Sequence, residues 1–438
     1  MSRAVEVEAE IEAVRQWAAK EVEQLLTAAV TALAAPGASL QTAEAVVRAG
    51  LQRLGGAILG GAVRALGNGY EGSRPACACG HSRKYLNDRP RQVVSLVGRF
   101  SLTRAYYWCP HCHASDAPLD RRLGIVGTAF SPAVVEAVGL LGARVPFATG
   151  RDVLMQLTGT AVSKRMHEEI AERLGAARLP VRPLVLPAPK DVPRRARPRP
   201  EEDLYVCADG TMAPTLQGWR EVKLGAVFHA ARGKDGLPER GATRYLGDLT
   251  DAETFGGDLY RAACTWGLAD ARRVVVLADG AVWIWNAADL HFPGAIQIVD
   301  WFHPSERLWT VAKICLGEQT PAAAAWARAA EKLLHQSRVE AVVRKLRALR
   351  PRDRQAQDAV AAAIGYFEAN AERMRYRRFR RLGLFIGSGV IEAGGKHIVG
   401  QRLKLSGMRW SDHGLRTILH LRLAVLNGDW PQQQKAAA

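Results

Sequence analysis

The sequence lacks a long apolar run and lacks a signal-peptide pattern. No stretch of 18 consecutive apolar residues occurs, and the residues after Met1 read Ser-Arg-Ala-Val-Glu-Val-Glu. A transmembrane helix needs about 20 mostly apolar residues, and a secretory signal joins a basic start to an apolar core. We therefore expect a cytoplasmic protein without a membrane partner.

Cysteine is scarce, and the number of cysteines is odd. The chain has seven, which without a secretion signal argues against a disulfide framework. Three of them, Cys207, Cys264 and Cys315, lie in apolar stretches and are expected to be small buried hydrophobic residues. The other four lie close together in the sequence.

Acidic residues are few relative to basic ones. The 43 Asp and Glu residues face 60 Lys and Arg residues, which gives a formal net charge of +17 and a pI near 9.9. Such an excess is typical of a surface that binds a polyanion. We expect the polyanion to be double-stranded DNA and the protein to be associated with the nucleoid.

The first 70 residues predict two helices. Apolar residues recur at three- and four-residue steps over residues 4–35, which predicts an amphipathic helix. A second helix over about residues 43–66 is rich in Gly and Ala. Such small residues suit close helix packing, either in an ordinary core or between subunits. We expect residues 1–70 to form a helical N-terminal region.

Two strand-like runs, 92–97 and 100–108, are framed by pairs of cysteines. The cysteines are Cys77, Cys79, Cys109 and Cys112. A hairpin with two thiolates at each end can close a tetrahedron around one structural zinc ion, so residues 71–125 are predicted to be a zinc-ribbon-like module. The one-residue gap in the first pair is shorter than usual. A module without metal stays possible, as do the alternative ligands His81, His111 and His113.

Three helices are predicted at 131–142, 149–158 and 163–174. The last two flank Gly-Thr-Ala-Val and resemble a helix-turn-helix. In such a unit the second helix lies in the major groove with its first residues at base edges, and these residues are Lys164 and Arg165. Plain helical packing would give the same pattern. Residues 126–178 are therefore expected to be DNA-binding helices.

Residues 179–203 are rich in proline and arginine. This composition predicts a stiff, extended linker, which is either a solvated spacer or a segment whose arginines touch phosphates. The arginines assigned to DNA contact are Arg194, Arg195 and Arg197.

The order of the predicted elements after the linker indicates a fold. The predicted strands lie at 204–209, 221–230, 243–246, 273–279 and 295–300, with helices at 251–267 and 283–290. Three antiparallel strands, a helix, a strand, a helix and a strand are the order of an RNase H-like domain. Residues 204–303 are expected to be the first part of this catalytic core.

Three acidic residues in this half of the chain lie in different local sequence contexts. Asp209 and Asp279 each end an apolar run, so their carboxylates are expected at the carboxyl ends of buried strands. Glu392 lies on a predicted helix after Gly387-Ser-Gly. An Asp-Gly pair is often only a turn. Together, however, three such carboxylates can hold the two Mg²⁺ (or Mn²⁺) ions that phosphoryl transfer requires.

Residues 304–382 predict helices almost throughout and would interrupt the core as an all-helical insertion. Its arginine-rich face either holds DNA or is merely solvated. The core then resumes over residues 383–430, which carry Glu392. Several residues near Glu392 are expected to contact DNA through their charge: Lys396, Arg402, Lys404 and Arg409. Trp410 is also assigned to DNA contact; like Trp283, Trp285, Trp301 and Trp309 it is a core residue by default, and which of the five could stack on an extruded base stays open. The predicted fold class is multidomain α+β.

Four segments carry a resemblance to a known family. They are Asp209-Gly-Thr, a block from Ala278-Asp-Gly-Ala to Phe-Pro-Gly-Ala, Ile298-Val-Asp-Trp-Phe-His, and the stretch from Gly387-Ser-Gly-Val-Ile-Glu to Arg-Trp-Ser411. They are similar to segments of bacterial insertion-sequence transposases of the ISKra group, in the Mutator-like branch of the DDE transposases. The resemblance covers about residues 75–427.

The resemblance implies a site and a reaction. The family's metal-binding carboxylates fall on Asp209, Asp279 and Glu392, and its Asp/Cys-x-x-His signature falls on Asp300 and His303. The imidazole of His303 could donate a hydrogen bond to a phosphate oxygen or shuttle a proton, or it could only fix the start of a helix.

We therefore expect a DDE transposase that cleaves insertion-sequence ends and joins them to target DNA. Because two ends must be held together, a homodimer or a larger synaptic oligomer is expected. The alternatives are a domesticated transposase that binds DNA without cutting and a stand-alone RNase H-like nuclease.

Overall fold

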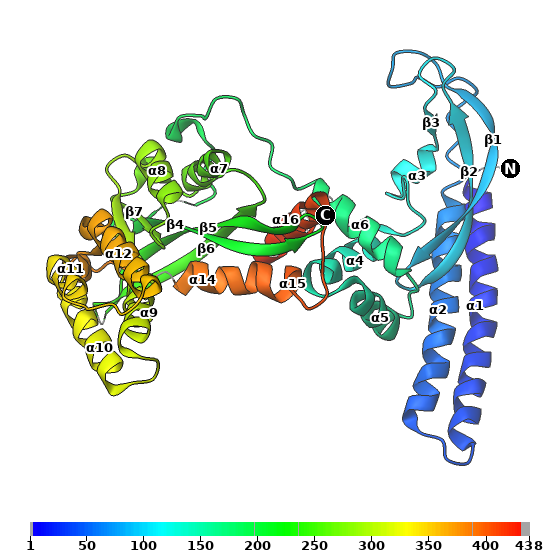
Figure 1. Cartoon of the computed structure of the whole chain (residues 1–438). Coiled ribbons are helices and arrows are strands. Elements are labelled where there is room, and N and C mark those ends of the chain that lie inside the picture. The colour runs from blue at the N-terminus through cyan, green and yellow to red at the C-terminus, as the bar shows by residue number, and fades with distance from the viewer. Residues whose placement is uncertain (1–2, 197, 235, 388, 431–438) are drawn as a thin grey trace. The chain divides into compact units, whose positions relative to one another are not determined.

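The chain is a mixed α/β protein with a three-stranded and a five-stranded sheet (Figure 1). The computed structural model describes residues 3–196, 198–234, 236–387 and 389–430, and the chain divides into two compact units, residues 1–171 and 172–438. Within the described ranges, no helix combines the length and the apolar character needed to cross a membrane.

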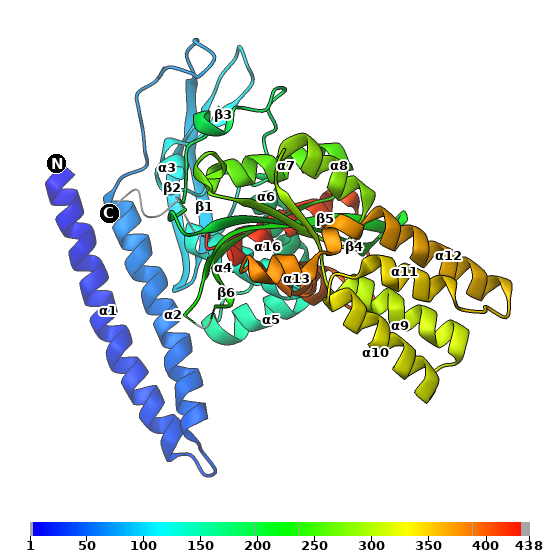
Figure 2. The same cartoon turned by 90° about the vertical axis from the view of Figure 1, so that its left-hand side faces the viewer.

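Unit 1 begins with a hairpin of two long helices, α1 (Arg3–Ala34) and α2 (Leu40–Ala65), which run side by side in opposite directions (Figure 2). The glycines of α2 allow this close approach. A Cβ at Gly50 would lie 2.4 Å from Leu25, and a Cβ at Gly61 would lie 2.3 Å from Val14. The two predicted helices are confirmed. Gly50 and Gly61 allow α1 to approach, while Gly55 and Gly56 lie against the backbone of Val97 and Arg99 in the neighbouring β-hairpin.

The three-stranded sheet follows the helical hairpin. Strands β1 (Lys84–Ser95) and β2 (Gly98–Trp108) form a long antiparallel pair, and β3 (Ser115–Asp116) pairs with the end of β2. The predicted first strand, 92–97, is too short, because pairing with β2 extends the strand back through polar residues that carry no alternating apolar signal. A small core beneath the sheet consists of Val63, Val93, Leu102, Leu119 and Ile125.

Four helices complete unit 1 and lead into unit 2. They are α3 (Pro118–Arg122), α4 (Pro132–Arg144), α5 (Phe147–Thr158) and α6 (Lys164–Ala176). Ser131 caps α4 by accepting a hydrogen bond from the Val134 amide, and α5 ends at Gly159 in the left-handed conformation. The three helices predicted for this region are confirmed within a few residues.

The five-stranded sheet of unit 2 has the strand order β6-β5-β4-β7-β8. Its strands are β4 (Asp203–Thr215), β5 (Gly218–Arg232), β6 (Pro238–Asp248), β7 (Val274–Ala278) and β8 (Ile296–Val299). The first three strands are antiparallel, whereas β7 runs parallel to both β4 and β8. Strands and helices occur in the predicted order along the chain.

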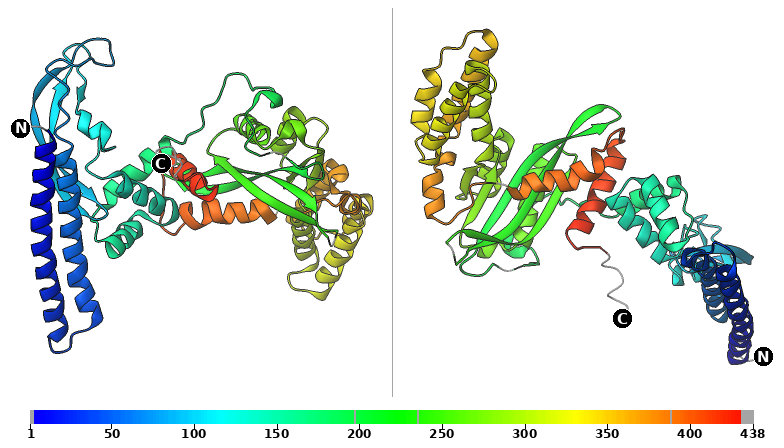
Figure 3. Two further views of the ribbon diagram at one scale, coloured as in Figure 1. Left: turned by 180° about the vertical axis from the view of Figure 1, so that it is seen from behind. Right: turned by 90° about the horizontal axis from the view of Figure 1, so that it is seen from below.

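Helices cover both faces of this sheet, so its central strands are buried on both sides. Helices α7 (Ala252–Thr265) and α8 (Val282–His291) lie on one side, and α14 (Gly389–Gly394) lies on the other (Figures 1 and 3). A π-helical turn, η4 (Gly395–Gly400), and α15 (Gln401–Leu403) continue α14, and α16 (Asp412–Leu426) packs on β6. Short 3-10 turns are η1 (Pro189–Asp191), η2 (Leu268–Asp270) and η3 (Ala371–Met374).

Between β8 and α14 the chain is helical, as predicted for residues 304–382. The helices are α9 (Phe302–Leu316), α10 (Pro321–His335), α11 (Val339–Arg347), α12 (Arg354–Ala369) and α13 (Tyr376–Arg381). Two hydrogen bonds fasten this helical segment to β8: Tyr376 Oη donates to the Val299 carbonyl at 3.0 Å, and Arg373 Nε donates to Gln297 Oε1 at 2.6 Å.

The Pro/Arg-rich segment 179–203 is not a solvated spacer over its first part. Arg182 forms ion pairs with Asp248 at 2.5 Å and with Asp258 at 2.7 Å. Arg261 Nη1 donates to the Val181 carbonyl at 2.6 Å, and Tyr260 Oη donates to the Pro187 carbonyl at 2.9 Å. The segment is therefore bound along α7 within unit 2.

Candidate functional site

Three aspartates form a row across adjacent strands of the five-stranded sheet. Ala208 of β4 pairs with Ala278 of β7, and Ala278 pairs in turn with Val299 of β8, all in parallel register. Asp209, Asp279 and Asp300 are the next residues of these three chain segments. Because neighbouring strands lie about 4.8 Å apart, the register brings the three aspartates together at one edge of the sheet. We call these three residues the acidic row.

Each aspartate of the acidic row is oriented by a hydrogen bond from a backbone amide one or two residues further along the chain. Its Oδ1 atom accepts from the amide of Gly210 at 2.7 Å for Asp209, of Ala281 at 2.8 Å for Asp279, and of Phe302 at 2.7 Å for Asp300. The expectation that Asp209 ends its strand is wrong, because β4 continues to Thr215 through its pairing with β5. Only the parallel pairing with β7 stops at Ala208.

The acidic row is crowded with negative charge. Burial raises the pKa of Asp209 above its usual value, and the charges of Asp279 and Asp300 raise it further, whereas the Gly210 amide and His303 lower it. Asp300 is 1% exposed, while Asp209 and Asp279 are half-buried. Clustered carboxylate oxygens that destabilise one another's charge are the donor set that a hard divalent cation prefers. These residues offer the oxygen ligands that Mg²⁺ or Mn²⁺ prefers, while the ligand atoms of the three are not all within 4.8 Å of one another.

His303 lies beside the acidic row on the first turn of α9. It is half-buried, and it interacts electrostatically with the Asp209 carboxylate, whose pKa it lowers. Arg307 follows one turn later on the same helix, and residues four apart lie on one helix face. Arg307 is exposed, and its guanidinium lies 4.1 Å from the centre of the Tyr366 ring.

Tyr366 comes from α12 and closes one side of the acidic row. Its hydroxyl donates to the Asp279 carbonyl at 2.9 Å. Burial raises the pKa of this hydroxyl, and the charges of Asp279 and Asp300 raise it too, while Arg307 lowers it. Gly280 has φ of +102°, and a Cβ there would lie 2.8 Å from the Tyr366 ring. A side chain at this position would strain the backbone and clash, so only glycine suits this close approach.

Glu392 does not join the acidic row through its carboxylate. It lies on α14, which packs against β4 and β5, but its side chain is 53% exposed and Oε1 pairs with Lys396 at 2.9 Å. Among the described residues, the groups of three or more potential ligands with atoms within 4.8 Å of one another contain only cysteines and histidines. The structure thus places Asp209, Asp279 and Asp300 at neighbouring positions of adjacent strands, with His303 three residues after Asp300, but no three of these residues have their ligand atoms within 4.8 Å of one another. Glu392 lies on the adjacent helix and is paired with a lysine.

Most of the cations expected to contact DNA are exposed, and several of them also bind protein groups. Lys164, Arg165 and Arg409 are exposed, although Arg165 pairs with Glu169 at 2.8 Å. Most of the others bind protein groups: Arg194 to Asp270, Arg195 to Asp429, Lys396 to Glu392, and Lys404 to Thr211 Oγ1. Arg197 lies outside the described residues.

Two residues near the C-terminal end of the core are inside the protein rather than on its surface. Arg402 is 0% exposed, and its guanidinium lies 5.1 Å from the ring centre of Trp410. Trp410 is 7% exposed, and its indole Nε1 donates to the Leu403 carbonyl at 3.0 Å. The expectation that these two residues contact DNA is not met, because each is covered by the other and by the surrounding core.

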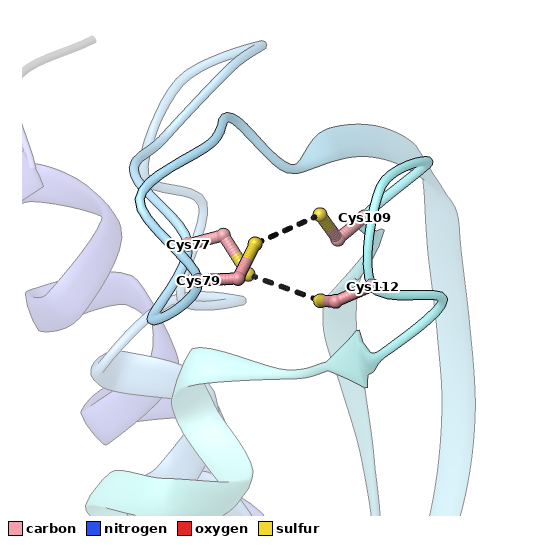
Figure 4. A group of neighbouring side chains, drawn as sticks. All are labelled: Cys77, Cys79, Cys109 and Cys112. Atoms are coloured by element: carbon pink, nitrogen blue, oxygen red, sulfur yellow. Dashed lines mark hydrogen bonds between the residues drawn. The ribbon is translucent and has the colours of Figure 1, made fainter.

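Four cysteine sulfurs form a second cluster, in unit 1 (Figure 4). Cys77 Sγ lies 3.7 Å from Cys112 Sγ, Cys79 Sγ lies 3.7 Å from Cys109 Sγ, and all four lie within 4.8 Å of one another. Zinc–sulfur bonds of about 2.3 Å place the sulfurs of a tetrahedral site roughly 3.8 Å apart, so the cluster has the size of a Cys₄ zinc site. Hydrogen bonding from the Cys112 backbone helps to lower the pKa of Cys109 to about 6.

The two alternative histidine ligands lie next to this cluster. Cys79, His81 and His111 also have their ligand atoms within 4.8 Å of one another. The His81 and His111 rings are stacked, with centres 3.6 Å apart. The short Cys77-x-Cys79 spacing does not prevent the four sulfurs from converging. His113, which has a positive φ of 58°, is outside both groups.

Arg307 and Tyr366 were not among the residues expected from the sequence. The four-residue spacing from His303 could have indicated Arg307. Nothing in the sequence indicates Tyr366, because α12 reaches the acidic row only through the packing of the helical insertion.

Comparison with known proteins gives one finding. A family model described as "Uncharacterised protein family (UPF0236)" matches residues 199–436, which is more than half of the chain. The matched region contains the five-stranded sheet, the acidic row, the helical insertion and Glu392, whereas the cysteine cluster lies before it. No curated protein matches the chain.

Proposed function

This chain belongs to the uncharacterised protein family UPF0236, and we propose that it is a DDE-type transposase that cleaves insertion-sequence ends and joins them to target DNA. The observation that carries the proposal is the acidic row, three carboxylates in register at one sheet edge with His303 beside them. The resemblance to the ISKra group places its signature residues at these same positions.

The strand order supports an RNase H-like assignment for the five-stranded sheet. Three antiparallel strands, β4 to β6, are followed by two parallel strands, β7 and β8, on the other side of β4. In this arrangement the first strand is central and carries the first carboxylate. The second carboxylate then follows the fourth strand, on the neighbouring segment.

Asp209, Asp279 and Glu392 would hold two divalent ions, with Asp300 adjacent. When bound, such a pair stabilises the attacking and leaving oxygens of an in-line phosphoryl displacement. For Glu392 to bind a metal ion, its carboxylate must leave Lys396 and turn toward the acidic row. His303 is placed to hold a hydrogen bond to a nonbridging phosphate oxygen or to move a proton at the attacking oxygen.

Arg307 and Tyr366 have separate roles in this proposal. Arg307 presents a charged, planar group at the rim of the acidic row, where its N–H groups can bind a backbone phosphate of the DNA strand. Tyr366 fixes the Asp279–Gly280 turn by its hydrogen bond to the Asp279 carbonyl. It also supports the Arg307 side chain from below by the cation–π contact.

Unit 1 would supply binding rather than chemistry. A zinc ion on the four cysteines would fasten the ends of the β1–β2 pair, and α6 would present Lys164 and Arg165 to a DNA groove as the second helix of a helix-turn-helix. The protein would act on nucleoid DNA as a homodimer or larger assembly, because two element ends must be joined together.

One observation favours the alternative of a DNA-binding protein that does not cut. Glu392 is paired with Lys396 and stands apart from the acidic row. A protein that had lost the ability to cleave DNA would keep its DNA-binding surface, and its Glu392 would stay away from the acidic row even when DNA is bound.

The deciding experiment is cleavage and joining of labelled DNA that carries the element's own ends, with Mg²⁺ or Mn²⁺. Wild type should nick and join, and Asp209→Asn, Asp279→Asn and Glu392→Gln should each lose activity by at least about 1000-fold while still binding the ends. Release of cut ends without joining would favour a nuclease. Binding without cleavage by wild type would favour the non-cutting alternative.

A further inference from the structure

The helical hairpin of unit 1 has an exposed apolar face that its own fold does not use. Helix α1 carries four large apolar residues at helical spacing, Val22, Leu26, Val30 and Leu33. Helix α2 carries three, Leu40, Leu51 and Ile58. Each of the seven side chains is between 48% and 71% exposed. Surface apolar residues are common singly, but seven on two neighbouring helices are unusual.

These residues are distinct from the stripe that joins the two helices. The contacts of Leu25 with Gly50 and of Val14 with Gly61 mark where α1 meets α2. Successive residues of a helix are turned by about 100° around its axis. Measured around the axis from the contact positions, the four α1 residues lie roughly 80–160° away, and the three α2 residues lie roughly 80–100° away in the same sense. Because the helices are antiparallel, equal turns in the same sense lead to the same face of the hairpin.

We propose that this face, which we call the hairpin face, binds the hairpin face of a second copy of the chain to form a four-helix bundle. Its size supports this partner. The seven side chains expose apolar surface on the order of 700 Å², close to the ~800 Å² that each partner contributes to a specific interface. Contiguous apolar patches of this size are rarely left open on a monomer.

The geometry of the hairpin face favours a self-complementary arrangement. The opposite charges of α1 and α2 are paired within the hairpin, Arg53 with Glu21 and Arg64 with Glu10, each at 2.6 Å, so the apolar area carries the choice of partner. Placing α1 against the partner's α2 makes every neighbouring pair antiparallel, as in bundles built from two hairpins. A two-fold axis along the helices produces this arrangement and uses the same patch twice.

The test is the mass of the full-length, zinc-loaded protein in solution, measured by sedimentation equilibrium. Wild type, 47.7 kDa per chain, should be a dimer at micromolar concentration. The double variant Leu26→Glu/Leu51→Glu should raise the dimer dissociation constant by about 100-fold or more, because charge would be buried in the interface. The control is Gln24→Glu, which adds one negative charge at an exposed position of α1 outside the hairpin face and should not change the constant.

A milder variant guards against misfolding of the double variant. Val30→Thr keeps the branched shape and adds one hydroxyl, so the fold should survive and dimerisation should weaken by several-fold. Circular dichroism would check that the helices persist. A wild-type monomer at high micromolar concentration would overturn the proposal, and so would a dimer whose dissociation constant is unchanged in both variants. Neither outcome depends on whether the protein cleaves DNA.

Discussion

At the scale of single residues, the acidic row is arranged before any ligand arrives. Each aspartate has one carboxylate oxygen held by a backbone amide one or two residues further along the chain. The second oxygens of Asp209 and Asp279 make no hydrogen bond to any residue that the structure describes. If the acidic row binds a divalent cation as proposed, carboxylates fixed in this way would lose little freedom, and the cation would relieve the charge repulsion that helps to raise the pKa of Asp209.

Asp209→Asn should stabilise the metal-free protein at neutral pH, by a few degrees in Tm, because the pKa of Asp209 is raised in the fold. A raised carboxyl pKa means that the folded state holds its proton to higher pH than the unfolded state. Stability is therefore lost as pH rises from the usual carboxyl range through the raised value, and the variant should lack this loss.

Differential scanning fluorimetry across pH 4–8 checks this prediction. Adding Mg²⁺ should raise the Tm of wild type and leave the variant nearly unchanged. A variant that is less stable than wild type throughout this range would show that repulsion in the acidic row is minor.

Arg307→Ala should slow DNA cleavage by about 100-fold, as expected for loss of one charged donor at a reacting phosphate, with little change in stability because the side chain is exposed. Tyr366→Phe should instead lower the free energy of unfolding by about 1 kcal/mol, through loss of the hydrogen bond to the Asp279 carbonyl. Single-turnover cleavage and thermal melting measure the two effects.

Arg354→Ala is the control for Arg307, since Arg354 lies on α12 and its side chain is 94% exposed. It should leave both cleavage and melting unchanged. Equal cleavage rates for Arg307→Ala and Arg354→Ala would remove Arg307 from the site.

The position of a single residue could be predicted from the sequence only where nearby residues in the chain determine it. Asp209, Asp279 and Asp300 each follow an apolar run, so parallel strands alone bring them together. Tyr366 could not be predicted, because its position depends on how α12 packs. Arg402 was misjudged, because a charged residue in a basic stretch reads as exposed, whereas this guanidinium is covered by Trp410.

At the scale of elements, the β1–β2 pair depends on the cysteine cluster at its end. We expect the protein to bind one zinc ion per chain. Cys112→Ser should lower the zinc content to well below one and loosen the strands, since a structural zinc contributes directly to folding. Zinc content by mass spectrometry and hydrogen exchange of residues 84–108 would test both points.

Cys315→Ser is the matched control, because Cys315 lies on α9, far along the chain from the four cysteines. It should keep the full zinc content. His81→Ala distinguishes the alternative ligand set: retained zinc supports four sulfurs, and lost zinc supports the group of Cys79, His81 and His111.

The order of elements was easier to predict than their lengths. All five strands of unit 2 were found, because buried strands read as continuous apolar runs. Their ends were missed where pairing alone extends them: β6 was expected over 243–246 but spans Pro238–Asp248, and it pairs with β5 through exposed polar residues. Backbone hydrogen bonds to a neighbouring strand do not depend on the side chains, so a strand of exposed polar residues shows no sequence pattern that would predict its ends.

At the scale of the whole molecule, the net charge of +17 predicts how DNA binding responds to salt. Each phosphate neutralised by Lys or Arg releases a counterion, so the logarithm of affinity should fall linearly with the logarithm of salt. Six to ten such contacts would weaken binding by about 10³- to 10⁵-fold between 50 and 200 mM salt.

Fluorescence anisotropy with a labelled duplex measures this slope. Lys164→Ala combined with Arg165→Ala should make it shallower by about two phosphate contacts if α6 lies on DNA. An unchanged slope would mean that α6 packs without touching DNA. A nearly flat slope for wild type would mean that its basic residues mainly serve internal ion pairs, as Arg182 and Arg195 do.

The separation of the cysteine cluster and the acidic row along the chain has a consequence for biosynthesis. All four cysteines precede residue 113, whereas the three aspartates span 209 to 300 and Glu392 comes later still. Domains fold as units during synthesis, the N-terminal one first. The unit that carries the cysteine cluster can therefore fold on the ribosome well before the three aspartates and Glu392 have been made. If the protein is a transposase as proposed, a message broken between these points would yield a fragment without the catalytic carboxylates, and we expect that fragment to compete with the complete protein for DNA.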